Sequence, residues 1–177
     1  MTRSIPLLLI TFCLLFFLNV YATANDKPES YEKIYPEIGY KTVADALDDF
    51  EQHFKKELKL PLRVPPISFT HHFGRFNDLD GDYNDSFEVT FINEKFSENH
   101  YKIDVRPIKN GVPIREKYVI KTYELKNGIL ATYMMISGFY VLIFEEGDWQ
   151  YMLSINKRVS DKVPPETLLD IANSIEY

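Results

Sequence analysis

The chain has 177 residues, of which 45% are hydrophobic and 15% aromatic, and its formal net charge is −6. This composition excludes an intrinsically disordered protein, because disordered chains have too few apolar and aromatic residues to build a core. The charge is spread without a basic block, which argues against nucleic-acid binding, since neutralising phosphates requires a concentrated positive face.

Residues 1–24 have the pattern of a secretory signal peptide. Arg3 gives a short positive start, residues 5–20 are almost entirely apolar, and Ala22-Thr23-Ala24 offers small side chains at the two positions that a signal peptidase requires. We predict cleavage after Ala24. The alternative is an uncleaved anchor, the one way in which this chain is expected to meet a membrane, but the apolar stretch is shorter than the roughly 20 residues that span a bilayer comfortably. The predicted location is therefore secreted or in the cell envelope.

Cys13 is the only cysteine and would leave with the signal. The exported chain would then have no disulfide, cysteine nucleophile or thiolate metal site. Residues 25–40 carry charges, two prolines and scattered tyrosines without periodicity, which predicts a linker. The remaining residues, 41–177, have the length of a single domain.

An amphipathic helix is expected over residues 43–58. Thr42 resembles an N-cap, with Asp45 three residues later in the position of a capping box. Apolar residues follow at spacings of four, three, four and four: Val43, Leu47, Phe50, Phe54 and Leu58. Prolines then hold residues 60–67 extended.

The period changes to two in residues 86–91 and 101–106, which is typical of half-buried strands. Further strands are expected near residues 114–125, 129–136, 139–145 and 149–157. Three turn candidates follow or separate these segments: Asn110-Gly111, Asn127-Gly128 and Glu146-Gly147-Asp148. Such short connections make neighbouring strands antiparallel.

Two segments, 133–136 and 139–144, are apolar at successive positions, so both faces of these strands should be covered, by helices. A last helix opens at Pro164-Pro165-Glu166, where proline is tolerated in the first turn. The sequence thus predicts an α+β fold with an N-terminal helix, about seven antiparallel strands and a C-terminal helix.

The four histidines do not form a metal-binding pattern. His71 and His72 are adjacent and would point to opposite faces of a strand, His53 lies off the helix stripe, and His100 is expected in a loop. Residues 78–85 concentrate oxygen ligands, as calcium loops do. Their spacing differs from an EF-hand, because Gly81 is fourth and Val89 twelfth when counted from Asp78. A solvated hairpin loop is therefore preferred, and no metal site is predicted.

No catalytic group or cofactor site is predicted either. Neighbouring carboxylates such as Glu145 with Glu146, or Asp48 with Asp49, do not face each other across a cleft as glycoside hydrolysis requires. The serines lie outside any nucleophile elbow, and there is no glycine-rich phosphate loop. The chain is expected not to be an enzyme.

Three segments of the C-terminal half carry a family resemblance: residues 127–133, with the pattern G-x-x-A-x-Y, residues 139–153, and residues 168–175, which include I-A-x-S. Together with the proline-rich segment after the helix, they resemble the DUF4367-type domain of exported Bacillus-like proteins. The resemblance implies a lipoprotein-carrier-like fold, in which helices lie on the concave side of a curved antiparallel sheet. It brings no catalytic residues.

These observations together predict an exported, non-enzymatic binding or accessory domain of the cell envelope. Its ligand, an apolar molecule or a partner protein, is not identified by the sequence. The alternatives are a small secreted hydrolase whose site is assembled from scattered residues, and a structural or regulatory domain. An apolar cavity without converging charged groups would favour binding, and a cleft with paired carboxylates or a histidine–carboxylate contact would favour catalysis.

Overall fold

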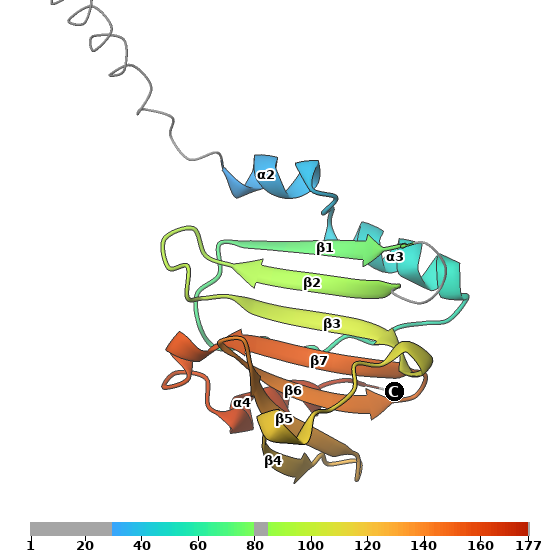
Figure 1. Cartoon of the computed structure of the whole chain (residues 1–177). Coiled ribbons are helices and arrows are strands. Elements are labelled where there is room, and N and C mark those ends of the chain that lie inside the picture. Colours follow the sequence, from blue (N-terminus) through green and yellow to red (C-terminus); the bar gives the residue numbers. More distant parts are fainter. Residues whose placement is uncertain (1–29, 80–84, 177) are drawn as a thin grey trace, which may run out of the picture.

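The computed structural model describes residues 30–79 and 85–176, and the signal segment predicted at residues 1–24 lies outside them. The described chain is built on one antiparallel sheet of seven strands in the order β1-β2-β3-β7-β6-β5-β4 (Figure 1). Its strands are β1 His71–Asn77, β2 Ser86–Ile92, β3 Tyr101–Pro107, β4 Val119–Glu124, β5 Leu130–Ile136, β6 Phe139–Glu146 and β7 Trp149–Asn156. The antiparallel α+β fold with a C-terminal helix is thus confirmed.

The helix expected after Thr42 is α3, Val43–Phe54. The Thr42 hydroxyl accepts a hydrogen bond from the Asp45 backbone N–H at 3.1 Å, as the capping pattern predicts. The helix ends earlier than expected, because Lys55 adopts a left-handed conformation with φ of 53°. Leu58 nevertheless reaches the core, and its N–H donates to the Glu51 side chain at 2.7 Å.

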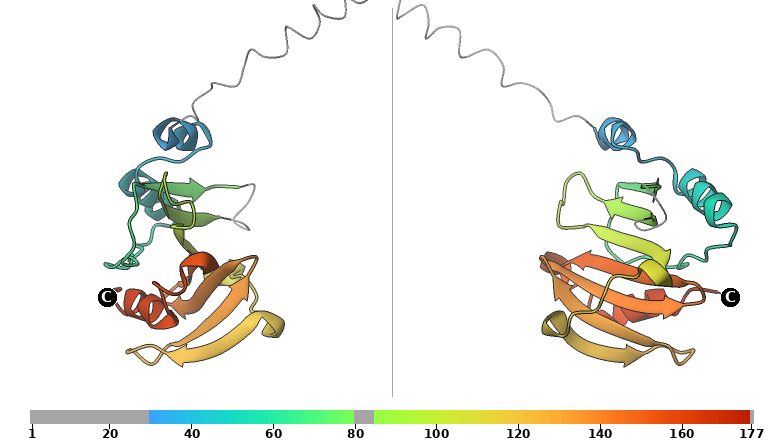
Figure 2. Two further views of the ribbon diagram at one scale, coloured as in Figure 1. Left: turned by 90° about the vertical axis from the view of Figure 1, so that its left-hand side faces the viewer. Right: turned by 45° about the vertical axis from the view of Figure 1, so that its right-hand side comes forward.

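The two longer helices pack on one face of the sheet, which we call the first face (Figure 2). There α3 contributes Phe50, whose ring lies 4.9 Å from that of Trp149. The C-terminal helix α4, Pro165–Ala172, contributes Leu168 and Ile171. The buried aromatic rings make this face a dry core, and burying them is the main source of its stability.

The close approach of α3 to β1 depends on Gly74. A Cβ atom at this position would lie 2.7 Å from the Cα of Val43 and 2.9 Å from the Cβ of Ala46. Any larger residue would therefore push α3 away from the strand.

One predicted turn differs from the structure. Asn110-Gly111 ends a short 3-10 helix, η1 (Ile108–Asn110), and Gly111 has φ of −59°. Gly111 is still needed there, because an added Cβ would lie 2.8 Å from the side-chain nitrogen of Gln150. The turn predicted at Asn127-Gly128 does connect β4 to β5, with Gly128 at φ of 86°.

The second face of β5, β6 and β7 is covered differently from the prediction. Met134, Val141 and Ile143 form a small apolar cluster that is packed by Tyr118 and Val119. These two residues come from the short 3-10 helix η2 (Glu116–Tyr118) and the start of β4. The expectation that helices cover both faces is wrong, because a short irregular segment is enough to bury three side chains.

The segment predicted as a linker contains helix α2, Tyr31–Glu37. Tyr35 of this helix stacks on Phe73 of β1 with ring centroids 4.6 Å apart. The tyrosine ring covers part of Phe73, which stays half-buried. Of the helices within residues 30–79 and 85–176, none combines the length and the apolar character needed to span a bilayer.

Candidate functional site

Ionisable side chains from three adjacent strands lie side by side on the second face of the sheet, opposite α3 and α4. The register places Arg75 opposite Glu88, and Glu88 opposite Asp104. Lys102 lies two residues before Asp104 on β3, on the same face. We call Arg75, Glu88, Lys102 and Asp104 the charged row.

Direct contacts connect the members of the charged row. One Glu88 oxygen lies 2.7 Å from the Lys102 ammonium and 3.4 Å from the Arg75 guanidinium. The other Glu88 oxygen accepts a hydrogen bond from the Tyr40 hydroxyl, and Lys102 also contacts Asp104 at 3.2 Å. Glu88 is only 4% exposed, so these partners offset the cost of burying its charge.

The pKa values in the row follow from this balance. Burial would raise the pKa of Glu88, but hydrogen bonds from Lys102 and Tyr40, with the charges of Lys102 and Arg75, hold it below its usual value. Burial would lower the pKa of Lys102, but the Asp104 and Glu88 carboxylates raise it. Burial dominates at Asp104 and raises its pKa. Glu88 and Lys102 therefore keep their charges firmly, whereas the neighbouring Asp104 carboxyl accepts a proton more readily than an ordinary aspartate.

A cavity of about 360 Å³ adjoins the charged row. Its lining has four polar residues and four apolar ones: His100, Lys102, Asp104 and Ser154, and Ile136, Phe139, Val141 and Met152. This volume lies at the small end of the range typical of ligand sites, about 300–1,000 Å³. Strand β7 contributes Ser154 and Met152 to the lining, and its neighbours β3 and β6 add the charged and the apolar residues on either side.

His100 borders the polar half of the cavity. Burial first, and then the charge of Lys102, lowers the pKa of its imidazole below the usual value, so the ring is neutral at neutral pH. Its Nε2 atom lies 3.2 Å from the Thr90 hydroxyl. Thr90 is only 2% exposed, so this hydroxyl is poorly placed to attack a substrate.

A second hollow, of about 400 Å³, lies beside Trp149 and Phe54. Its rim carries Lys56 and Asp148, which contact each other at 2.8 Å while both remain more than half exposed. Exposed pairs of this kind contribute little. The cavity at the charged row is the better candidate because its polar groups are partly buried and Lys102 is held in place by Glu88 and Asp104.

The other histidines considered from the sequence lie apart from this cavity. His72 lies opposite Phe91 on the first face and stacks on its ring, whereas His71 contacts Glu32 of α2 at 2.7 Å. The two rings therefore have different surroundings, as their adjacency on a strand predicts. His53 lies 2.9 Å from Asp85, a contact that the sequence did not suggest.

The sequence-adjacent carboxylates are separated in the structure. Glu145 accepts a hydrogen bond from Gln150, and Glu146 accepts one from Asn127. Asp49 pairs with Lys41. These side chains therefore have unrelated partners.

The charged row was not identified from the sequence, although its signal was present. Residues 101–106 alternate, so Lys102 and Asp104 were expected on the polar face of a strand. Alternation within one strand does not reveal which residues of the neighbouring strand lie opposite. The burial of Glu88 and its contact with Lys102 depend on the register of β2 against β3.

No family model, curated protein or solved structure matches this chain. The resemblance to DUF4367-type domains is therefore neither supported nor contradicted, and it stays a prediction.

Proposed function

We propose that this chain is an exported, non-enzymatic binding domain that holds a small amphipathic ligand in the cavity of the second face. The observation that carries the proposal is the division of the lining into a polar half beside the charged row and an apolar half. Export rests on the signal pattern of residues 1–24.

The apolar half suits a short hydrocarbon chain or ring. Each methylene group that leaves water for the surface of Ile136, Phe139, Val141 and Met152 contributes about 0.8 kcal/mol. The polar half offers the Lys102 ammonium, the His100 ring and the Ser154 hydroxyl to a head group with oxygen acceptors. Lys102 is already fixed by Glu88 and Asp104, so little side-chain freedom is lost when a ligand binds.

The alternative is a small secreted hydrolase, because Ser154, His100 and Asp104 line the same cavity. A serine hydrolase requires the histidine to contact the nucleophile and a carboxylate to orient the histidine. Here Nε2 of His100 contacts Thr90. Hydrolysis of p-nitrophenyl butyrate by the purified protein, lost in Ser154→Ala, would support this alternative and contradict the non-enzymatic proposal.

Binding is tested with two probes, 1-anilinonaphthalene-8-sulfonate followed by fluorescence and decanoate followed by its displacement of that dye. Met152→Trp should weaken both by at least about tenfold, because the indole occupies the cavity. Met135→Trp is the matched control, since Met135 is 44% exposed and does not line the cavity. Equal binding by the two variants, or no saturable binding by the unaltered protein, would contradict the proposal.

A further inference from the structure

A buried carboxylate without a full set of partners lies at the start of β2. The side chain of Asp85 is 1% exposed. Its Oδ1 atom accepts a hydrogen bond from the Leu79 N–H at 3.2 Å, whereas its buried Oδ2 atom accepts none. A buried carboxylate oxygen that has lost its water requires a compensating positive partner.

Two further ligand atoms converge on this oxygen. His53, near the C-terminal end of α3, places Nε2 2.9 Å from Oδ2 of Asp85. Asp78, just after β1, adds a carboxylate oxygen, and the three ligand atoms all lie within 4.8 Å of one another. The three residues come from a helix and from the two ends of the β1–β2 connection, so the tertiary fold alone assembles them.

The contact between His53 and Asp85 does not have the geometry of a hydrogen bond, since Oδ2 has no hydrogen-bond partner despite the 2.9 Å separation. Two ligand atoms bound to one Zn²⁺ at about 2.1 Å in its tetrahedral geometry would lie roughly 3.4 Å apart. The observed separation is shorter, and a small outward movement of the exposed His53 side chain would bring the pair to the distance between two ligands of one ion.

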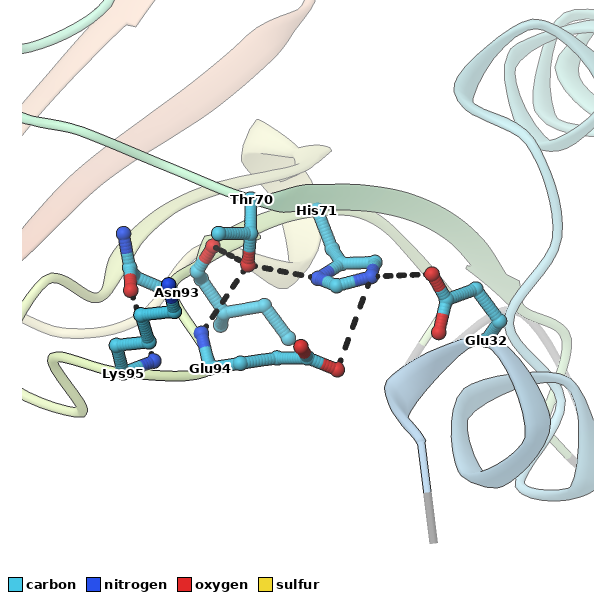
Figure 3. A network of polar contacts seen from close by, with 7 residues as sticks. Glu32, Thr70, His71, Asn93, Glu94 and Lys95 are labelled. Carbon is cyan, nitrogen blue, oxygen red and sulfur yellow. Dashed lines mark hydrogen bonds and ion pairs between the residues drawn. The ribbon is translucent and has the colours of Figure 1, made fainter.

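The group formed by Glu32, His71 and Glu94 provides a contrast (Figure 3). There Nε2 of His71 is in a true hydrogen bond with Glu32 at 2.7 Å, and Nδ1 contacts the Thr70 hydroxyl at 2.8 Å. Glu94 lies farther away, at 4.0 Å. Both ring nitrogens have partners and both carboxylates are solvated, so this group requires no ion.

We propose that His53, Asp78 and Asp85 bind a divalent transition-metal cation. One imidazole nitrogen with two carboxylate oxygens is a donor set for Zn²⁺ and its first-row neighbours, whereas Ca²⁺ takes oxygen ligands only. The bound cation supplies the positive partner that Oδ2 of Asp85 lacks and ties the end of α3 to the β1–β2 connection. Asp80 and Asp82, considered for calcium from the sequence, lie outside the described residues.

Isothermal titration of the EDTA-treated protein with ZnCl₂ tests the site. We expect one Zn²⁺ per chain, a dissociation constant in the micromolar range or below, and a thermal midpoint that rises with Zn²⁺ by mass action. CaCl₂ at the same concentration should leave the midpoint unchanged.

Variants separate this site from unspecific binding. Asp78→Asn changes an exposed residue, so the protein should fold normally while its affinity for Zn²⁺ falls by at least about tenfold. His53→Gln should have the same effect, and circular dichroism checks its fold. His71→Gln, in the contrasting group, should bind Zn²⁺ like the unaltered protein. Affinity weaker than about 100 µM, affinity unchanged in Asp78→Asn and His53→Gln, or affinity lost in His71→Gln would each overturn the proposal.

Discussion

The two faces of the sheet are formed by the same strands but carry different kinds of side chain. On β3, Tyr101, Ile103 and Val105 point to the first face and are at most 3% exposed, in a core of aromatic and aliphatic side chains. Lys102 and Asp104 alternate with them and point to the second face, where Lys102 pairs with both Glu88 and Asp104 and the two residues border a cavity. The first face therefore stabilises the fold, and the second face keeps buried polar groups that the core would not tolerate.

Side chains that alternate between the two faces of a strand do not necessarily alternate between buried and solvated positions. The pleat fixes which face a side chain joins, and the cover of that face decides its burial. Tyr40 and Arg75 close over Glu88, which turns a residue expected on the polar face into a buried one. A buried charge is kept only where partners surround it.

The largest effect should come from the first face. Trp149→Ala removes a ring that contacts Phe50 and Phe54 and an indole N–H that donates to the Glu57 carbonyl at 3.3 Å. We expect the free energy of unfolding to fall by about 3–5 kcal/mol, measured by urea denaturation. Phe139→Ala, on the half-buried lining of the cavity, should cost only about 1–2 kcal/mol. Equal losses would mean that the second face is as well packed as the first.

The next effect should come from the charged row. Lys102→Met leaves the buried Glu88 and Asp104 carboxylates without their shared cation. Because Lys102 is partly exposed, we expect a loss of about 2 kcal/mol, less than for a fully buried pair. Lys56→Met is the matched control, since its exposed pair with Asp148 should contribute less than about 1 kcal/mol. A loss no greater in Lys102→Met than in this control would show that the row is effectively solvated.

The smallest effect concerns pH. The folded protein holds the pKa of His100 below its usual value, first through burial and then through Lys102, so the unfolded chain binds this proton more readily. The neutral His100 ring contributes its full stability above the pKa that this residue has in the unfolded chain, about 6.5. That contribution is lost as the pH falls from there through the lower pKa of the folded protein.

His100→Gln should therefore flatten the decline of the urea midpoint as the pH is lowered from 7 to 5. The pKa of Glu88 is also held low, against the effect of burial, by Lys102, Tyr40 and Arg75, so its contribution is lost only in more acidic solution, below about pH 4.3. His72→Gln is the control variant and should keep the original decline. An unchanged decline in His100→Gln would show that this ring is solvated in the folded state.

Local patterns were sufficient wherever a structural rule acts over a few residues. The capping pair at Thr42, the apolar stripe of α3, the alternation of β3 and the turn at Gly128 all appear in the structure close to where the sequence places them. Each depends on helix or strand periodicity or on a backbone angle, which neighbouring residues determine. The same rules failed at Asn110-Gly111, where packing against Gln150 fixes the backbone. Strand β2 was expected to be half-buried, but it is buried on both faces.

The sequence by itself determined the fold class, the antiparallel pairing and the dry first face, because periodicity and short turns encode them. Only the tertiary structure decided which ionisable groups meet. Glu88 and Lys102 are 14 positions apart in the chain, and His53 and Asp85 are 32 apart. Strand register joins the first pair, and the seating of α3 against β1 joins the second. Charges interact through space, so a polar site whose members come from different elements exists only after the core has placed those elements together.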